Sequence, residues 1–64
     1  VPSYNWTRRG ANLPRGSITT NYNRVLVIPK VQVEDQGEYI CRATNDRNSI
    51  VNSVILSIQG IILV

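Results

Sequence analysis

The feature that most limits the fold of this chain is a regular alternation of short β-favouring runs with clusters of turn residues. Val, Ile, Thr and Tyr favour strands, whereas Gly, Pro, Asn and Asp interrupt them and form turns. The chain holds no long stretch of the Ala, Leu, Glu and Lys residues that favour helices. An all-β fold is therefore expected, with strands at about residues 4–8, 17–20, 24–28, 38–44 and 49–59, and at most a single helical turn at 34–37.

Within each expected strand, successive side chains point to opposite faces of the sheet. In the first strand this alternation turns Trp6 inward and Asn5 outward. In the fourth strand it turns Tyr39 and Cys41 inward and Arg42 outward. The pattern predicts that the Trp6 indole and the Cys41 thiol share one buried interior, as opposite walls of a sandwich.

One cysteine and no histidine among 64 residues exclude several kinds of chemistry. A structural zinc site needs several Cys or His ligands, and the common catalytic triads and dyads need a histidine. Glu34 and Asp35 are adjacent on an expected turn, so their carboxylates diverge instead of forming a catalytic pair. We therefore expect no metal, no cofactor, no small-molecule substrate and no enzymatic activity.

Length and charge narrow the class of protein further. Sixty-four residues allow at most one domain, and 42% hydrophobic with 17% charged residues is ordinary for a globular chain. Six arginines and one lysine give a net charge of +3, but they are scattered along the sequence. A solvated, mildly basic surface is the simpler interpretation, and an acidic, heparin-like glycan partner is the alternative. No nucleic-acid partner is expected.

The segment Asp35-Gln36-Gly37-Glu38-Tyr39-Ile40-Cys41 has the spacing D-x-G-x-Y-x-C. Trp6 precedes Cys41 by 35 residues, and Leu26 and Ile28 lie on the strand between them. In this order the motifs resemble the immunoglobulin superfamily, and within it the intermediate-set (I-set) domains of the neural cell-adhesion and contactin-like type.

The resemblance implies an immunoglobulin-like Greek-key β-sandwich over residues 1–59, containing strands C to G, with strands A and B absent from the chain. Cys41 is then one half of a disulfide whose partner belongs to strand B. Residues 60–64 form an apolar tail of unassigned role. Without the missing strands, we expect that these 64 residues alone do not form a stable monomeric sandwich. The implied core consists of Trp6, Leu26, Ile28, Tyr39, Cys41 and Leu56.

The resemblance also implies a tyrosine corner, in which the Tyr39 hydroxyl turns back onto nearby backbone beside Asp35 and Gly37. An ion pair between Asp35 and either Arg15 or Arg24 is expected to close the same end of the domain. Asn5-Trp6-Thr7 fits the N-glycosylation acceptor pattern, and Asn5 is an outward position.

For function, the resemblance implies protein–protein recognition, homophilic or heterophilic, by an extracellular or cell-surface adhesion or receptor protein. The alternative is a structural spacer domain of an intracellular muscle filament protein, in which Cys41 stays reduced. The candidate interface residues are Ile40 and Arg42 on a sheet face, and Asn45, Asp46 and Arg47 at a hairpin tip.

Overall fold

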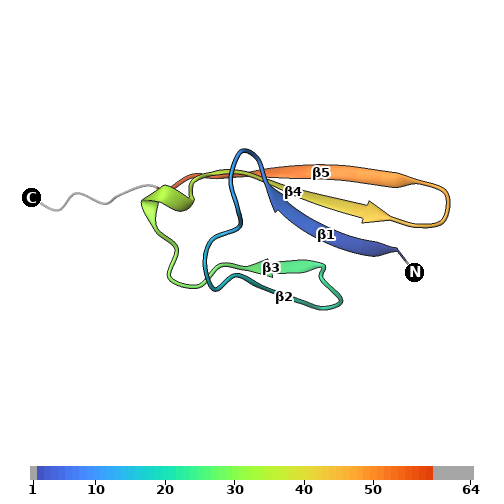
Figure 1. The fold of residues 1–64 in the computed structure, drawn as a ribbon, viewed down its shortest axis with the longest axis horizontal. Coiled ribbons are helices and arrows are strands. Elements are labelled where there is room, and N and C mark those ends of the chain that lie inside the picture. The colour runs from blue at the N-terminus through green and yellow to red at the C-terminus, as the bar shows by residue number, and fades with distance from the viewer. Residues whose placement is uncertain (1, 59–64) are drawn as a thin grey trace, which may run out of the picture.

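The computed structural model describes residues 2–58, and its strands form two antiparallel sheets (Figure 1). Three strands make the larger sheet, in the order β1-β4-β5, and β2 pairs with β3 in the smaller one. The expectation of an all-β, incomplete sandwich is confirmed. Gln59 and the apolar tail 60–64 lie outside the described residues. The elements are β1 (Ser3–Arg8), β2 (Ile18–Thr20), β3 (Val25–Val27), the 3-10 helix η1 (Val33–Asp35), β4 (Gly37–Thr44) and β5 (Ser49–Leu56).

The register of the larger sheet sorts its residues between two faces. Trp6 on β1 is directly opposite Cys41 on the central strand β4, and Cys41 is directly opposite Asn52 on β5. Directly opposed residues of antiparallel strands point to the same face. Trp6 and Cys41 therefore share one face, as expected, but they are neighbours in one sheet, so the expectation that they form opposite walls of the sandwich is wrong. We call this face, which is turned toward the smaller sheet, the inner face.

The smaller sheet is a short hairpin whose turn has an unusual backbone. Asn21, Tyr22 and Asn23 follow one another with φ of 52°, 58° and 66°, the left-handed region that costs about 1–2 kcal/mol per ordinary residue. The turn is held by the Trp6 indole, whose Nε1 donates to the Asn23 carbonyl at 3.0 Å. The Thr19 hydroxyl donates to the Asn23 side chain at 2.5 Å. Trp6 on β1 of the larger sheet therefore helps to hold the turn of the smaller one.

The expected helical turn before β4 is the 3-10 helix η1. The Gln32 backbone N–H donates to the Asp35 carboxylate at 2.8 Å, which is half of a capping box. No helix within residues 2–58 is long and apolar enough to cross a membrane.

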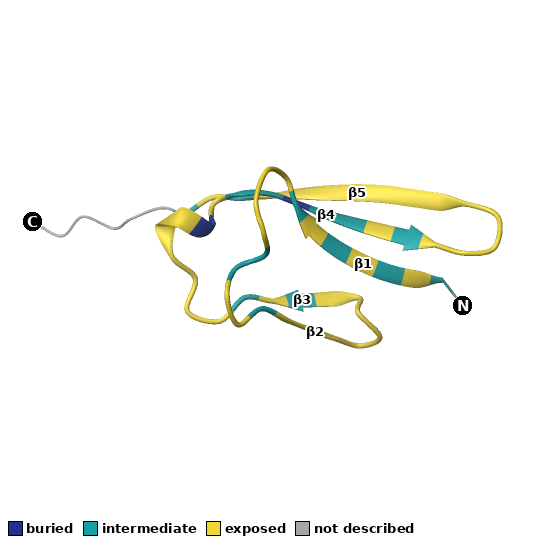
Figure 2. Ribbon diagram, viewed as in Figure 1, coloured by how far each residue is buried: buried dark blue, intermediate teal, exposed yellow. Residues whose placement is uncertain are grey.

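The interior between the two sheets is thin. Figure 2 shows that most of residues 2–58 are exposed or half-buried. Tyr39, with 4% of its surface exposed, is the only buried apolar residue of this part of the chain. The smaller sheet covers only part of the inner face, because its two strands have three residues each. Ile50 and Val54 on the edge strand β5 consequently remain exposed.

Candidate functional site

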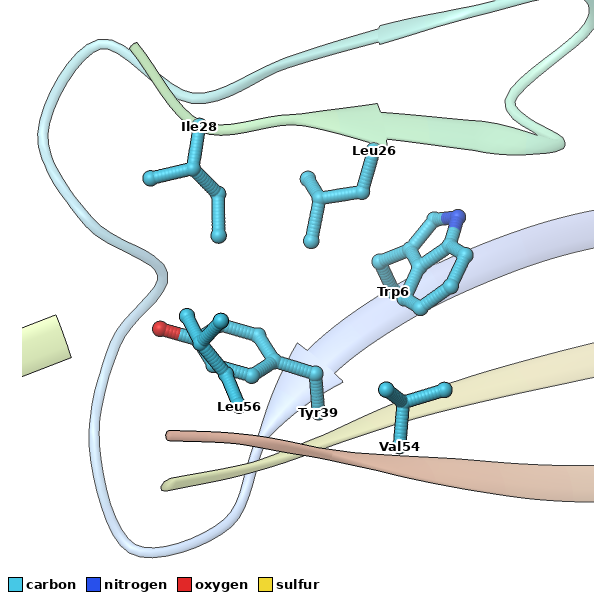
Figure 3. A pocket seen from close by; sticks show the side chains of 6 residues that line it. All are labelled: Trp6, Leu26, Ile28, Tyr39, Val54 and Leu56. Carbon is cyan, nitrogen blue, oxygen red and sulfur yellow. The ribbon is translucent and has the colours of Figure 1, made fainter. Parts of the chain in front are cut away.

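The space between the sheets contains an apolar cavity of about 180 Å³ that is open to solvent (Figure 3). The only polar side-chain atoms on its lining residues are the Tyr39 hydroxyl and the Trp6 Nε1, and both donate to backbone carbonyls. The lining therefore offers no carboxylate, amine or thiol. The cavity is lined by Trp6, Leu26, Ile28, Tyr39, Val54 and Leu56.

Five of the six predicted core residues line this cavity, and the sixth, Cys41, does not. Cys41 lies half-buried on the inner face beside Trp6, and its thiol is unpaired within residues 2–58. Val54, which the spacing of two along the strand places on the same face as Leu56, also lines the cavity, although it was not among the predicted core residues and more than half of its surface is exposed.

The buried end of the molecule is built around Tyr39. Its hydroxyl donates to the Asp35 carbonyl at 2.6 Å, so a buried backbone acceptor of the corner is satisfied. Gly37 opens β4 with a φ of +153°, a conformation that side-chain-bearing residues rarely adopt, and a Cβ there would lie 3.5 Å from Arg8 Nε. The corner is a structural device that sets the start of β4.

Arg8 is a residue of this corner that the sequence reasoning missed. Its Nη2 donates to the carbonyls of Glu34 at 2.5 Å and Gln36 at 3.0 Å, and its guanidinium lies 5.6 Å from the Tyr39 ring centre. The alternation of side chains along β1 could have identified it, because Arg8 follows Trp6 by two residues and therefore faces inward as well. A charged group on an inner face requires partners.

The expected ion pair of Asp35 with Arg15 or Arg24 is wrong. Within residues 2–58 the only ion pair joins Arg9 to Glu38. The Asp35 carboxylate is used instead by the Gln32 N–H, and the Arg24 guanidinium lies 5.2 Å from the Tyr4 ring centre.

The opposite, outer face of the larger sheet has a different character. Its residues form rows across the three strands. One row consists of Thr7, Ile40 and Ser53, and the next row, two residues along each strand, consists of Asn5, Arg42 and Val51. Ile55 follows Val51 by four residues on β5, so both are diagonal neighbours of Ile40. We call Ile40, Val51 and Ile55 the apolar cluster. Ile40 is half-buried, while Val51 and Ile55 expose 49% and 70% of their surface.

Polar groups border the apolar cluster. At one end, Arg9 donates to the Glu38 carboxylate, and this hydrogen bond, with one from Ser53, lowers the pKa of Glu38 below its ordinary value. At the other end, Arg42 Nη1 donates to the Ser49 hydroxyl at 3.2 Å. An apolar centre with a polar rim is the usual composition of a protein-binding surface.

The hairpin tip between β4 and β5 extends this face. The Asn45 side-chain oxygen accepts hydrogen bonds from the backbone N–H groups of Arg47 at 2.8 Å and Asn48 at 2.7 Å. These two hydrogen bonds hold the turn, and the side chains of Asp46 and Arg47 are exposed and take no part in them. The structure therefore places the predicted tip residues beyond the Arg42 end of the outer face.

Comparison with known proteins agrees with this architecture. The family model described as "Immunoglobulin domain" matches residues 1–45. Contactin of Drosophila melanogaster is 48% identical over 92% of the chain, and the neural cell adhesion molecule L1-like protein of Homo sapiens is 40% identical over 70%. Vascular endothelial growth factor receptor 1 of Mus musculus is 33% identical over 94%.

The chain spans only 4%, 4% and 5% of the lengths of these three relatives. No solved structure matches it significantly. The family match and the two-sheet architecture together identify the chain as a member of the immunoglobulin domain family, of the kind found in contactins and related adhesion molecules and receptors.

Proposed function

We propose that this chain is a non-enzymatic recognition module of a cell-surface or secreted adhesion or receptor protein, and that its outer face binds another protein. The observation that carries the proposal is the apolar cluster, because apolar residues gathered on an exposed sheet face and bordered by polar groups mark interaction sites. The names of the relatives support the adhesion and receptor setting.

The geometry of the apolar cluster suits a protein partner. Ile40 lies on the central strand and is already half-desolvated, so it can act as a rigid anchor. Val51 and Ile55 add exposed apolar surface on the edge strand. Pockets for small molecules are concave, whereas the face of a partner protein can cover all three residues, which lie side by side on neighbouring strands.

Arg42 and the tip residues Asn45, Asp46 and Arg47 supply the polar margin of the proposed surface. Charges at the rim of an interface mainly affect the rate of association and the choice of partner, and contribute less to affinity. Ile40 is thus proposed as the energetic centre, and the four polar residues as determinants of specificity.

The experiment compares two substitutions of exposed apolar residues by a charge in the natural-length protein. Ile55→Glu places a carboxylate in the apolar cluster, whereas the control Val33→Glu changes a residue of similar exposure (65% against 70%) on η1. Binding is measured by aggregation of coated beads, for self-association, and by binding to cells that display candidate surface proteins.

Ile55→Glu should weaken binding at least tenfold, since its carboxylate would be buried in the complex beside Ile40 without a partner. Val33→Glu should leave binding within about twofold. Equal binding by the two variants would contradict the proposal. It would favour instead a spacer domain, such as those of intracellular muscle filament proteins, in which no sheet face serves as a contact.

A further inference from the structure

The outer face of the larger sheet is divided into two unlike halves. On the edge strand β1 the outward residues are small and polar, namely Ser3, Asn5 and Thr7. On the opposite edge strand β5 they include Val51 and Ile55. The apolar cluster therefore occupies the β4–β5 half, and the β1 half offers hydroxyl and amide groups only.

We infer that Asn5 carries an N-linked glycan. Asn5-Trp6-Thr7 is the acceptor pattern, and in β1 Asn5 and Thr7 are both exposed on the outer face, about 7 Å apart along the strand. Trp6 between them is half-buried on the inner face and holds its own hydrogen bond there. The core therefore presents the two recognition residues of the acceptor pattern together to solvent.

The space around Asn5 is open on both sides. β1 is an edge strand, so within residues 2–58 no strand pairs with the flank of Asn5 that faces away from β4. Across the sheet its neighbour is Arg42, whose guanidinium donates to Ser49 on β5 and so leans away from Asn5. A bulky sugar at this position displaces no packed side chain.

The chemistry is a group transfer in the secretory pathway. A bond forms between the Asn5 side-chain nitrogen and the first carbon of an oligosaccharide carried on a lipid diphosphate. The bond from that carbon to the diphosphate breaks, the lipid diphosphate leaves with the bonding electron pair, and the amide nitrogen loses one proton. The inference rests on the proposed function to the extent that both require passage through this pathway.

The glycan gives the proposed binding surface a boundary. Asn5 is in register with Arg42 and Val51, and β1 lies about 10 Å from β5, two strand spacings away. A sugar chain over β1 excludes a partner from that half. It leaves the Ile55 end of β5, four residues farther along, open to a partner.

The test is mass spectrometry of the natural-length protein secreted from insect or mammalian cells. The peptide containing Asn5 should lose mass when the glycan is removed enzymatically, with Asn5 converted to Asp. Asn5→Gln and Thr7→Ala should abolish the modification, whereas the matched variant Thr7→Ser should keep it. An unmodified Asn5 in secreted protein, or the same modification surviving in Thr7→Ala, would overturn the inference.

Binding of the Asn5→Gln protein then tests the boundary separately. Loss of the glycan should change affinity less than about threefold, while Ile55→Glu reduces it tenfold or more. A tenfold loss in Asn5→Gln would show that the partner binds the glycan half, and would overturn the boundary. The glycan itself is detected by mass without any partner, so it can fail while the proposed recognition function stands.

Discussion

Replacing Arg8 by Ala should open the corner between η1 and β4, while replacing its neighbour Arg9 should not. The two arginines are adjacent in sequence, but Arg8 is turned to the inner face and Arg9 pairs with Glu38 at the surface. They therefore form a matched pair in which charge and side-chain size are the same and only the surroundings differ.

The magnitude follows from the contacts of Arg8. Its Nη2 donates to two carbonyls, at 2.5 and 3.0 Å, and its third contact, Nη1 to the Asn12 carbonyl at 3.4 Å, is long. A hydrogen bond from a charged group contributes about 1.5–3 kcal/mol, and because Arg8 is half-exposed the freed carbonyls regain water in part. We expect a local cost of about 2–3 kcal/mol for Arg8→Ala and a much smaller one for Arg9→Ala, because solvent screens a surface ion pair.

The assay is amide hydrogen exchange of residues 33–41 in the natural-length protein, followed by mass spectrometry. Exchange from a locally opened state reports the free energy of that opening, with about 1.4 kcal/mol for each factor of ten. Arg8→Ala should speed exchange about 30- to 150-fold and Arg9→Ala less than about sixfold. The increase in exchange rate for Arg8→Lys should lie between those of the two alanine variants, because an ammonium keeps the charge but lacks the planar fork of a guanidinium. Equal effects of the two alanine variants would refute the reasoning.

Four further outcomes are expected. Tyr39→Phe should destabilise the natural-length protein by about 1–3 kcal/mol in thermal unfolding, because the buried Asp35 carbonyl loses its donor; an unchanged melting temperature would contradict this. In an NMR titration the pKa of Glu38 should lie below that of an unpaired Glu. The ion pair therefore stabilises the fold above the ordinary Glu pKa, and this contribution is lost as the pH falls through the lowered pKa. Arg9→Ala should raise the pKa of Glu38, and an unchanged pKa in that variant would exclude the pair in solution. Tyr22→Gly should stabilise the protein by up to about 1 kcal/mol in denaturant unfolding by relieving a left-handed φ at a side chain that is 84% exposed, whereas Tyr22→Ala keeps the strain and should not. The 64-residue chain by itself should unfold without a cooperative transition in calorimetry, since only one apolar side chain of residues 2–58 is buried, and a sharp transition would disprove this.

The sequence was sufficient to predict the strands and the faces of β1 and β4. Alternation of apolar and polar residues has the period of a strand, so Tyr39 and Trp6 could be assigned to the interior without coordinates. Alternation does not say which strand is the neighbour of which. The relation of Trp6 to Cys41 depends on pairing between residues 35 apart, and only the structure supplied the β1-β4 register.

The partners of the charged groups could not be predicted from the sequence either. The Asp35 carboxylate is satisfied locally by a backbone N–H three residues away, so it does not need the arginine that was assigned to it. Arg8 instead reaches backbone carbonyls, which every residue possesses and which leave no trace in the amino-acid pattern. The left-handed turn at Tyr22 is hidden for a similar reason, because the indole hydrogen bond that helps to hold it comes from another sheet.

The period of two along β1 also links the core to the surface. Trp6 can reach the turn of the smaller sheet only from the inner face, and this requirement places Asn5 and Thr7 on the outer face. A shift of the β1 register by one residue would bury the acceptor asparagine and expose the indole, so the core contact defines the modification site. In β1 the inner face is thus occupied by the contact of Trp6 with the smaller sheet, whereas Asn5 and Thr7 are exposed and take no part in that contact. Substitutions of these two outer residues are therefore expected to leave the Trp6 hydrogen bond intact.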